Sequence, residues 1–317
     1  MKHLDEKGVI RIISSALGID DLDDVATIAL AGQQLVFKSD MLVGSTDVPS
    51  QMKPWQAARK SIVSCASDLA AKGATPVAAM ISLGLPKAVT ESYVRGLAGG
   101  FRAASKEFGV KIVGGDTNET GGLIIDCSMI GVLAGAGNKV PPRSGARRGD
   151  SVVISGRFGY PAVGFALLLK GALSAGGQFH QRAVDSVLEP QPRQKFGTAL
   201  ARFFTSSIDS SDGLAISLYE LALQSHVNIQ VDYESLMGQG VDEFAQANKM
   251  NAKELVFYGG EEYEIVATIP PSIVPKALAV AKKAGVELIV IGKVKNGSGL
   301  VHAGKALLEN RGYTHFT

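Results

Sequence analysis

Short β-rich runs alternate with helical stretches over the first 133 residues, and this order restricts the fold more than any other feature of the sequence. Two β-rich runs, VATIAL and QLVFKSDMLV, follow a short amphipathic stretch at 5–18. Helical spacing at 55–74 and at 90–109 brackets the strand-like TPVAAMISLGLP. Two more β-rich runs, VKIVGGDT and LIIDCSMIGVLAG, complete the pattern. The order β-β-α-β-α-β-β predicts an α+β layer with two helices on one face of a sheet.

A segment rich in proline, glycine and arginine, GNKVPPRSGARRGD at 137–150, predicts a domain boundary. Because 317 residues exceed what one core usually serves, we expect two α/β-layer domains, at 1–140 and 148–317. In the second, helices are expected at 161–173, around 190–205, after SSDGL, and at 272–285. Its strands are expected at SVVISG, VNIQVDY, EYEIVATI and ELIVIG.

Composition excludes several classes of function. The net charge is only +2 and the basic residues are dispersed, so the chain lacks the electrostatic footprint of a nucleic-acid binder. Its first residues are too charged for a signal peptide, and the most apolar run, 161–177, is too short and interrupted to span a bilayer. Cys65 and Cys127 stand alone in apolar stretches, which is typical of reduced thiols in a cytoplasmic protein.

Many acidic residues stand at the ends of predicted strands or at junctions between elements. An aspartate in such a place is commonly a turn residue, and one residue of DSSDGL (209–214) caps a helix in the simplest reading. Asp68 is harder to explain, because it lies on a helix among small apolar neighbours, where an unpaired carboxylate is costly. Several carboxylates brought together repel unless cations neutralise them, and an oxygen-only ligand set favours Mg²⁺.

Mg²⁺ in proteins is usually shared with substrate phosphates, which indicates a nucleotide. The chain has no GxxxxGK[ST] loop, no GxGxxG after a strand, and no protein-kinase signature. ATP would therefore be held by metal ions and by the backbone amides of glycine turns.

The sequence resembles the superfamily of aminoimidazole ribonucleotide synthetase, selenophosphate synthetase and thiamine-monophosphate kinase, and within it most closely the last family. Eight segments carry the resemblance in order along nearly the whole chain: LDDVATI (22–28), KSDMLV (38–43), SDLAAKGATP (67–76), GGDT (114–117), RSGARRGD (143–150), DSSDGL (209–214), GGEEYE (259–264) and GYTHF (312–316). The last two favour the kinase.

This resemblance implies a PurM-like α+β fold whose first domain pairs in a homodimer. It implies that ATP donates its γ-phosphoryl group directly to thiamine monophosphate, with several Mg²⁺ ions and no side-chain nucleophile. The implied metal ligands are Asp23, Ser39, Asp40, Asp68, Asp116, Asp209 and Asp212. The implied ATP-binding residues are Gly115, Asp116, Arg143 and Ser211. The implied substrate-binding residues are Asp47, Glu261 and Tyr313.

Two readings compete with this one. Another ATP-using member of the superfamily, such as aminoimidazole ribonucleotide synthetase, is built on the same scaffold. A non-catalytic ATP–Mg²⁺ sensor would bind the nucleotide without consuming it. Its support is the altered stretch VGSTDVP, which has Asp47 where the family often has a histidine that touches substrate.

Overall fold

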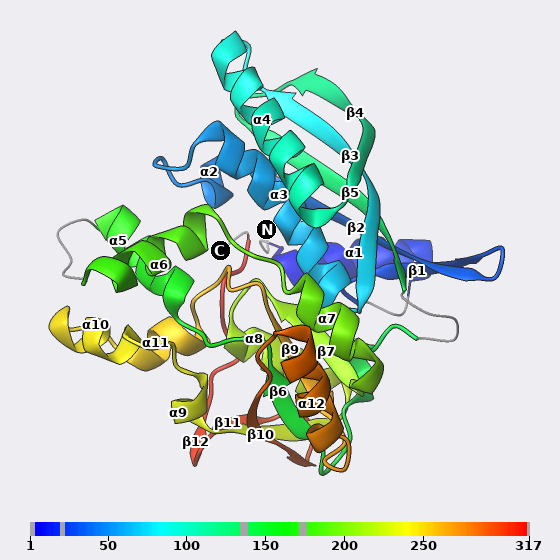
Figure 1. The fold of residues 1–317 in the computed structure, drawn as a ribbon, viewed down its shortest axis with the longest axis vertical. Coiled ribbons are helices and arrows are strands. Elements are labelled where there is room, and N and C mark those ends of the chain that lie inside the picture. The colour runs from blue at the N-terminus through cyan, green and yellow to red at the C-terminus, as the bar shows by residue number, and fades with distance from the viewer. Residues whose placement is uncertain (1–3, 20–22, 134–138, 171–175, 316–317) are drawn as a thin grey trace.

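The computed structural model describes residues 4–19, 23–133, 139–170 and 176–315 (Figure 1). Parts of five sequence predictions lie outside these ranges: Leu22 of the first quoted segment, Phe316 of the last, the end of the helix expected at 161–173, the end of the strand-like LIIDCSMIGVLAG, and the start of the boundary segment at 137–150.

Five strands form the first sheet, in the order β1-β2-β5-β3-β4. Their bounds are Ala26–Leu30 (β1), Gln33–Val43 (β2), Ala74–Leu85 (β3), Lys111–Glu119 (β4) and Ile124–Leu133 (β5). Strands β3 and β4 are parallel, and the other neighbours are antiparallel. The helices of this half are α1 (Glu6–Leu17), α2 (Gly44–Asp47), α3 (Pro54–Ala71) and α4 (Glu91–Phe108). The β-β-α-β-α-β-β order expected from the sequence is confirmed, with the short α2 as an addition.

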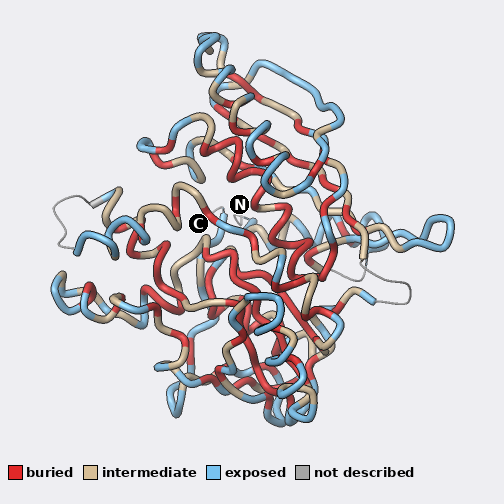
Figure 2. The backbone as a smooth tube through the Cα atoms, viewed as in Figure 1, coloured by how far each residue is buried: buried red, intermediate tan, exposed pale blue. Residues whose placement is uncertain are grey.

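Helices α3 and α4 cover one face of this sheet, and the other face is open (Figures 1 and 2). Helix α3 starts with Pro54 in its first turn, and α4 starts after the cap Thr90 and ends at Gly109, whose φ is 67°. On the open face, Met41 and Met80 are 58% and 52% exposed. The α+β layer with helices on one side is therefore the observed arrangement.

The second sheet has seven strands in the order β12-β11-β8-β10-β6-β9-β7. Their bounds are Ser151–Ile154 (β6), Ser206–Ser210 (β7), Val227–Val231 (β8), Glu264–Ile269 (β9), Ile289–Asn296 (β10), Val301–Ala303 (β11) and Ala306–Leu307 (β12). Strand β7 is not expected from the sequence, because its residues, SSIDS, are mostly polar. It forms because it pairs along its whole length with β9.

Eight α-helices and two short 3₁₀ turns accompany the second sheet in the described ranges. They are η1 (Arg143–Gly145), α5 (Tyr160–Lys170), α6 (Gly177–Leu188), α7 (Gln194–Leu200), η2 (Ala201–Phe203), α8 (Leu214–Gln224), α9 (Tyr233–Leu236), α10 (Val241–Ala247), α11 (Ala252–Phe257) and α12 (Val274–Ala284). The sequence does not predict α6 or the short helices α9 to α11. No helix in the described ranges is both long and apolar enough to cross a membrane.

Helix α3 lies between the two halves and is buried over most of its length. Its Arg59 guanidinium donates to the Pro190 carbonyl at 2.7 Å, and the Ser207 hydroxyl donates to the Ala71 carbonyl at 2.7 Å. Gly197 of α7 approaches so closely that a Cβ there would lie 1.8 Å from the Ala70 carbonyl oxygen. Helix α3, which belongs to the first half of the chain, thus makes direct contacts with the second half. The domain limits at 1–140 and 148–317 stay a prediction.

Two adjacent glycines of α4 offer a test of this packing. A Cβ at Gly100 would lie 2.2 Å from the Trp55 carbonyl oxygen, whereas a Cβ at Gly99 meets nothing within 4 Å. We expect Gly100→Ala to lower the free energy of unfolding by about 1–3 kcal/mol, because α4 must move away from α3. Gly99→Ala is the matched control and should raise it by about 0.5–1 kcal/mol through helix propensity. Urea unfolding of both variants checks the pair, and equal effects would contradict the packing described.

Candidate functional site

Three buried carboxylates from separate elements meet where the two halves join. Asp24 precedes β1, Asp68 lies on α3, and Asp209 lies near the end of β7. One oxygen of each lies within 4.8 Å of the others, and all three residues are at most 6% exposed. Oxygen-only ligands at this spacing suit Mg²⁺, so the cluster fits the kind of metal site that the sequence predicts.

Burial makes this cluster electrostatically costly in the absence of a cation. Desolvation and then the charge of Asp209 raise the pKa of Asp68 well above its ordinary value. Desolvation and then the charge of Asp24 raise the pKa of Asp209 to about 6. Hydrogen bonding compensates only in part, as the Ser67 hydroxyl donates to Asp209 Oδ2 at 3.0 Å.

Lys72, at the C-terminal end of α3, neutralises one side of the cluster. Its side chain is fully buried, with Nζ 2.6 Å from Asp23 Oδ1 and 2.9 Å from Asp24 Oδ2. The same ammonium donates to the main-chain carbonyl of Ser207 at 2.7 Å. Burial alone would raise the pKa of Asp24, but Lys72 and the Arg143 guanidinium together hold it below its ordinary value.

The sequence predicts Asp23 as a metal ligand, whereas the structure brings its neighbour Asp24 into the cluster. Asp23 accepts a hydrogen bond from the Arg143 amide at 3.1 Å and pairs with Lys72. Only the adjacency of two aspartates in LDDVATI marks Asp24 in the sequence. Arg143, a predicted ATP ligand, is ion-paired through its guanidinium with Asp24, and Nε donates at 2.8 Å.

Strand β2 presents its predicted ligands on opposite faces, because side chains alternate along a strand. Asp40 and Lys38 share the inward face with the buried Val36. Burial raises the pKa of Asp40, and the charge of Lys38 opposes this. Ser39 faces the open side instead, where its hydroxyl hydrogen-bonds Ser128 at 2.9 Å and donates to Asp126 Oδ1 at 3.1 Å. The structure therefore brings Asp40, but not Ser39, toward α3.

Two further predicted residues, Asp116 and Gly115, lie on β4 at the exposed edge of the first sheet. Three inter-strand steps separate β4 from β2, so Asp116 and Asp40 lie about 14 Å apart. Gly115 has a local reason to be glycine, since a Cβ there would lie 1.6 Å from the Ile81 carbonyl oxygen. Within one chain these two residues do not join the carboxylate cluster.

The DSSDGL segment forms a loop between β7 and α8 that touches two other predicted segments. The Glu261 amide donates to the Ser211 carbonyl at 2.5 Å, and the Tyr313 amide donates to the Asp212 carbonyl at 2.9 Å. Gly213 adopts a φ of 115°, which glycine allows at little cost. Asp212 reaches solvent, and desolvation together with the charge of Asp209 raises its pKa to about 6.

Two of the three predicted substrate residues, Glu261 and Asp47, contact Lys60, which the sequence does not predict. Lys60 of α3 is 1% exposed, forms an ion pair with Glu261, and donates to the Asp47 carbonyl at 2.7 Å. Burial raises the pKa of Glu261, and its Oε2 has no hydrogen-bond partner in the described part of the chain. Glu261 and Tyr263 have φ values of 63° and 52°, unusual for residues other than glycine and frequent at functional sites.

Tyr313 belongs to the same region and is 44% exposed. Desolvation and then the charge of Asp47 raise the pKa of its hydroxyl, and Thr46 and Glu261 also interact with it. Its ring meets that of His315 edge-on, with centroids 5.0 Å apart. The C-terminal tail is thus held beside the loop of α2 and beside Glu261.

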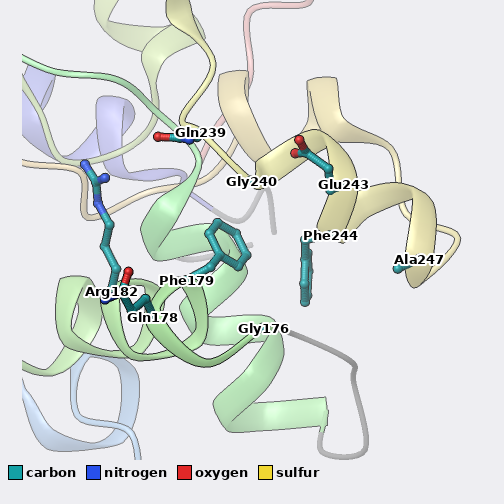
Figure 3. Close-up of a pocket in the computed structure, with 9 residues that line it drawn as sticks. All are labelled: Gly176, Gln178, Phe179, Arg182, Gln239, Gly240, Glu243, Phe244 and Ala247. Carbon is teal, nitrogen blue, oxygen red and sulfur yellow. The ribbon is translucent and has the colours of Figure 1, made fainter.

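A cavity of about 790 Å³ lies elsewhere, between α6 and the segment that leads into α10 (Figure 3). Phe179 and Phe244 stand in its wall with ring centroids 6.1 Å apart, and Arg182 and Glu243 supply its charged groups. Its lining contains one carboxylate, that of Glu243, whereas a metal-bound triphosphate needs several carboxylates to hold its metal ions.

Two family models match the chain. AIR synthase related protein, N-terminal domain, matches residues 22–133, and AIR synthase related protein, C-terminal domain, matches residues 147–305. A thiamine-monophosphate kinase of Nitrosopumilus maritimus is 39% identical, with all of both chains covered. One of Pyrococcus horikoshii is 34% identical, with 95% of this chain and 91% of the relative covered. The chain belongs to the thiamine-monophosphate kinase family.

Solved structures of the thiamine-monophosphate kinase family have the same fold. A structure described as AaThiL complexed with AMPPCP and TMP superposes with a TM-score of 0.87 at 27% identity, covering 100% of this chain and 98% of that one. The thiamine monophosphate kinase of Aquifex aeolicus gives a TM-score of 0.83 at 26% identity, covering 95% and 98%. The expected PurM-like α+β fold and the expected kinase family are confirmed.

Proposed function

We propose that this protein transfers the γ-phosphoryl group of ATP to the phosphate of thiamine monophosphate, giving thiamine diphosphate and ADP. The observation that carries the proposal is the buried cluster of Asp24, Asp68 and Asp209, beside a loop whose Ser211 carbonyl accepts a hydrogen bond from the Glu261 amide. Family membership supports the same reaction, because the relatives named above are thiamine-monophosphate kinases. So does the neighbour AaThiL, whose structure holds AMPPCP and TMP.

Mg²⁺ fits the carboxylate cluster, and Asp24, Asp68 and Asp209 would hold it, with Asp40 and Asp212 nearby. When bound, Mg²⁺ would neutralise phosphate charge and orient the reacting groups. Neighbouring side chains keep these carboxylates in place: Lys72 and Arg143 pair with Asp24, and the Ser67 hydroxyl donates to Asp209. Metal binding by Asp23 and Ser39 stays a prediction.

Transfer needs no covalent intermediate with the protein. An oxygen of the thiamine phosphate attacks the γ-phosphorus in line, the bond from that phosphorus to the β–γ bridging oxygen breaks, and ADP leaves. Ser211, on the loop after β7, would contact the nucleotide phosphates, and Arg143 would add a positive charge beside them.

Glu261, Asp47 and Tyr313 form the side of the site that would hold thiamine. The carboxylate of Glu261 suits an amino group or a cationic ring, and the half-exposed ring of Tyr313 offers an aromatic face. Lys60 keeps Glu261 in place through their ion pair and supports the backbone at Asp47. This arrangement supports a thiamine phosphate as acceptor although Asp47 stands where the family often has a histidine.

A homodimer explains the placement of Gly115 and Asp116. These residues lie too far from Asp40 to act in the same site of one chain, but the open face of the first sheet exposes apolar side chains such as Met41, Met80 and Val113. We propose that two first sheets pair through this face, so that Asp116 of one copy serves the site of the other.

Mixing two inactive variants tests this pairing. Asp116→Ala and Asp209→Asn homodimers should each be inactive, whereas subunit exchange should restore about a quarter of wild-type activity, because half of the dimers carry one intact site. The activity of the mixture after exchange, relative to the separate variants, is the measurement. Recovery of no activity from dimers shown to have exchanged would place both residues in one chain's site.

The reaction itself is tested by incubating the protein with ATP, Mg²⁺ and thiamine monophosphate and following thiamine diphosphate and ADP by chromatography. Equal amounts of the two products are expected, and Asp212→Asn should form far less of both. Binding of ATP–Mg²⁺ without either product would favour a sensor and overturn the proposed function. ADP formed without thiamine diphosphate would point to another phosphate acceptor.

A further inference from the structure

Lys38 places a second positive charge among the carboxylates, beside Asp68, whereas Lys72 pairs with Asp23 and Asp24. It lies on the inward face of β2, and its Nζ lies 2.8 Å from Asp68 Oδ2. Asp68 is one of the three clustered carboxylates. The two side chains are 22% and 7% exposed, so water screens their attraction weakly.

Two other carboxylates of the site also face this ammonium. Asp40 lies two residues along the same face of β2, and Asp209 belongs to the same carboxylate cluster as Asp68. A lysine ammonium is charged at neutral pH. Lys38 therefore stays charged beside three residues that the sequence predicts as metal ligands. The Lys38 ammonium thus supplies one positive charge at a place where a metal ion would otherwise have to neutralise the carboxylates.

Lys38 differs from the other lysine of the cluster in what holds it. Lys72 is fully buried and donates to the main-chain carbonyls of Pro141 and Ser207, which ties it to the fold. Lys38, by contrast, interacts only with carboxylates among the described residues. Its charge therefore bears on the electrostatics of the site more than on the joining of the two halves.

We propose that the ammonium of Lys38 is a built-in cation of the carboxylate site that neutralises Asp68 and competes with a divalent ion for the same oxygens. Lys38 then determines how many divalent ions this chain binds and how tightly. The proposal rests on the metal site of the proposed function, but binding of metal alone tests it independently of any kinase activity.

The experiment measures Mn²⁺ binding by equilibrium dialysis at neutral pH, without nucleotide or thiamine phosphate. Lys38→Met and Lys38→Gln remove the charge, Lys38→Arg retains it, and Lys106→Met removes an exposed lysine of α4 as a control. Both neutral variants should bind Mn²⁺ at least about tenfold more tightly than the wild type, because a repelling charge beside Asp68 is gone. Lys38→Arg and Lys106→Met should bind as the wild type does.

Thermal unfolding gives a second readout that a purely structural lysine would not produce. Without metal, the neutral variants should unfold at a lower temperature than the wild type, since Asp68 loses its partner. Mn²⁺ should raise their Tm by more than it raises that of the wild type. Unchanged or weaker Mn²⁺ binding by the neutral variants, or a Tm deficit that Mn²⁺ does not reduce, would overturn the proposal.

Discussion

Asp209→Asn is expected to lower kcat for thiamine diphosphate formation at least about 1,000-fold and, in the same protein, to stabilise the metal-free fold. The loss of activity follows because an amide is neutral and a weaker metal ligand than the carboxylate it replaces in the cluster. Metal ions held by such a cluster stabilise the transition state of the transfer by several kcal/mol. The gain in stability follows because the variant removes one of three buried charges that repel each other.

The pH dependence of that gain has a definite sign. Asp209 has an ordinary pKa of 3.8 and a folded-state pKa of about 6, so between these values the folded state binds more protons than the unfolded state. The carboxylate therefore destabilises metal-free wild type fully above pH about 6, and this penalty disappears as the pH falls toward 4. The penalty is on the order of 2–3 kcal/mol at neutral pH.

Urea unfolding in the presence of a chelator measures this difference. The free energy of unfolding of Asp209→Asn should exceed that of the wild type at pH about 7.5, and the two should converge near pH about 4.5. Asp185→Asn, on α6 and away from the cluster, is the control and should follow the wild type. A variant less stable than the wild type at neutral pH would contradict the view that Asp209 is strained by its neighbours.

Lys60→Met is expected to destabilise the fold by about 2–4 kcal/mol, because Glu261, whose side chain is 21% exposed, is left without its buried cation. Any variant that folds should also have a strongly raised KM for thiamine monophosphate, since both Glu261 and the backbone at Asp47 lose their support. Urea unfolding and steady-state kinetics with ATP held saturating check the two effects.

A double variant separates the charge from the packing. Lys60→Met combined with Glu261→Gln removes both charges, so its stability should recover by more than about 1 kcal/mol relative to Lys60→Met alone. Its KM should stay raised, because Glu261 is the group proposed to contact substrate. Equal stability of the single and double variants would show that the ion pair does not hold this region together.

Much of the fold could be predicted from the pattern of residues within each short stretch of the sequence. The two helices α3 and α4 have apolar residues at helical spacing, and the five strands of the first sheet are β-rich runs bounded by turn residues, so the sequence predicts them. Strand β7 could not be found in this way, because SSIDS is polar and becomes a strand only through its pairing with β9. The short helices α9 to α11 have too few turns to show a period.

The residues of the candidate site also fall into those that the sequence predicts and those that only the structure shows. Motifs that resemble those of the kinase family mark Asp68, Asp209, Asp212 and Glu261, because eight such segments occur in the family's order along the chain. The choice between adjacent residues needs the structure. Whether Asp23 or Asp24 enters the cluster depends on where Lys72 and Arg143 lie, and whether Ser39 or Lys38 faces Asp68 depends on which face of β2 is covered by α3.

The sequence by itself determined the family, the α+β class and the acidic chemistry of the site, since these depend on residue types and on spacing along the chain. Only the tertiary structure decided which cations accompany the carboxylates. Lys60 meets a partner 201 residues away, and Lys38 meets one on another element. Pairings of this kind arise where α3 packs between two sheets, and no local pattern of the sequence encodes them.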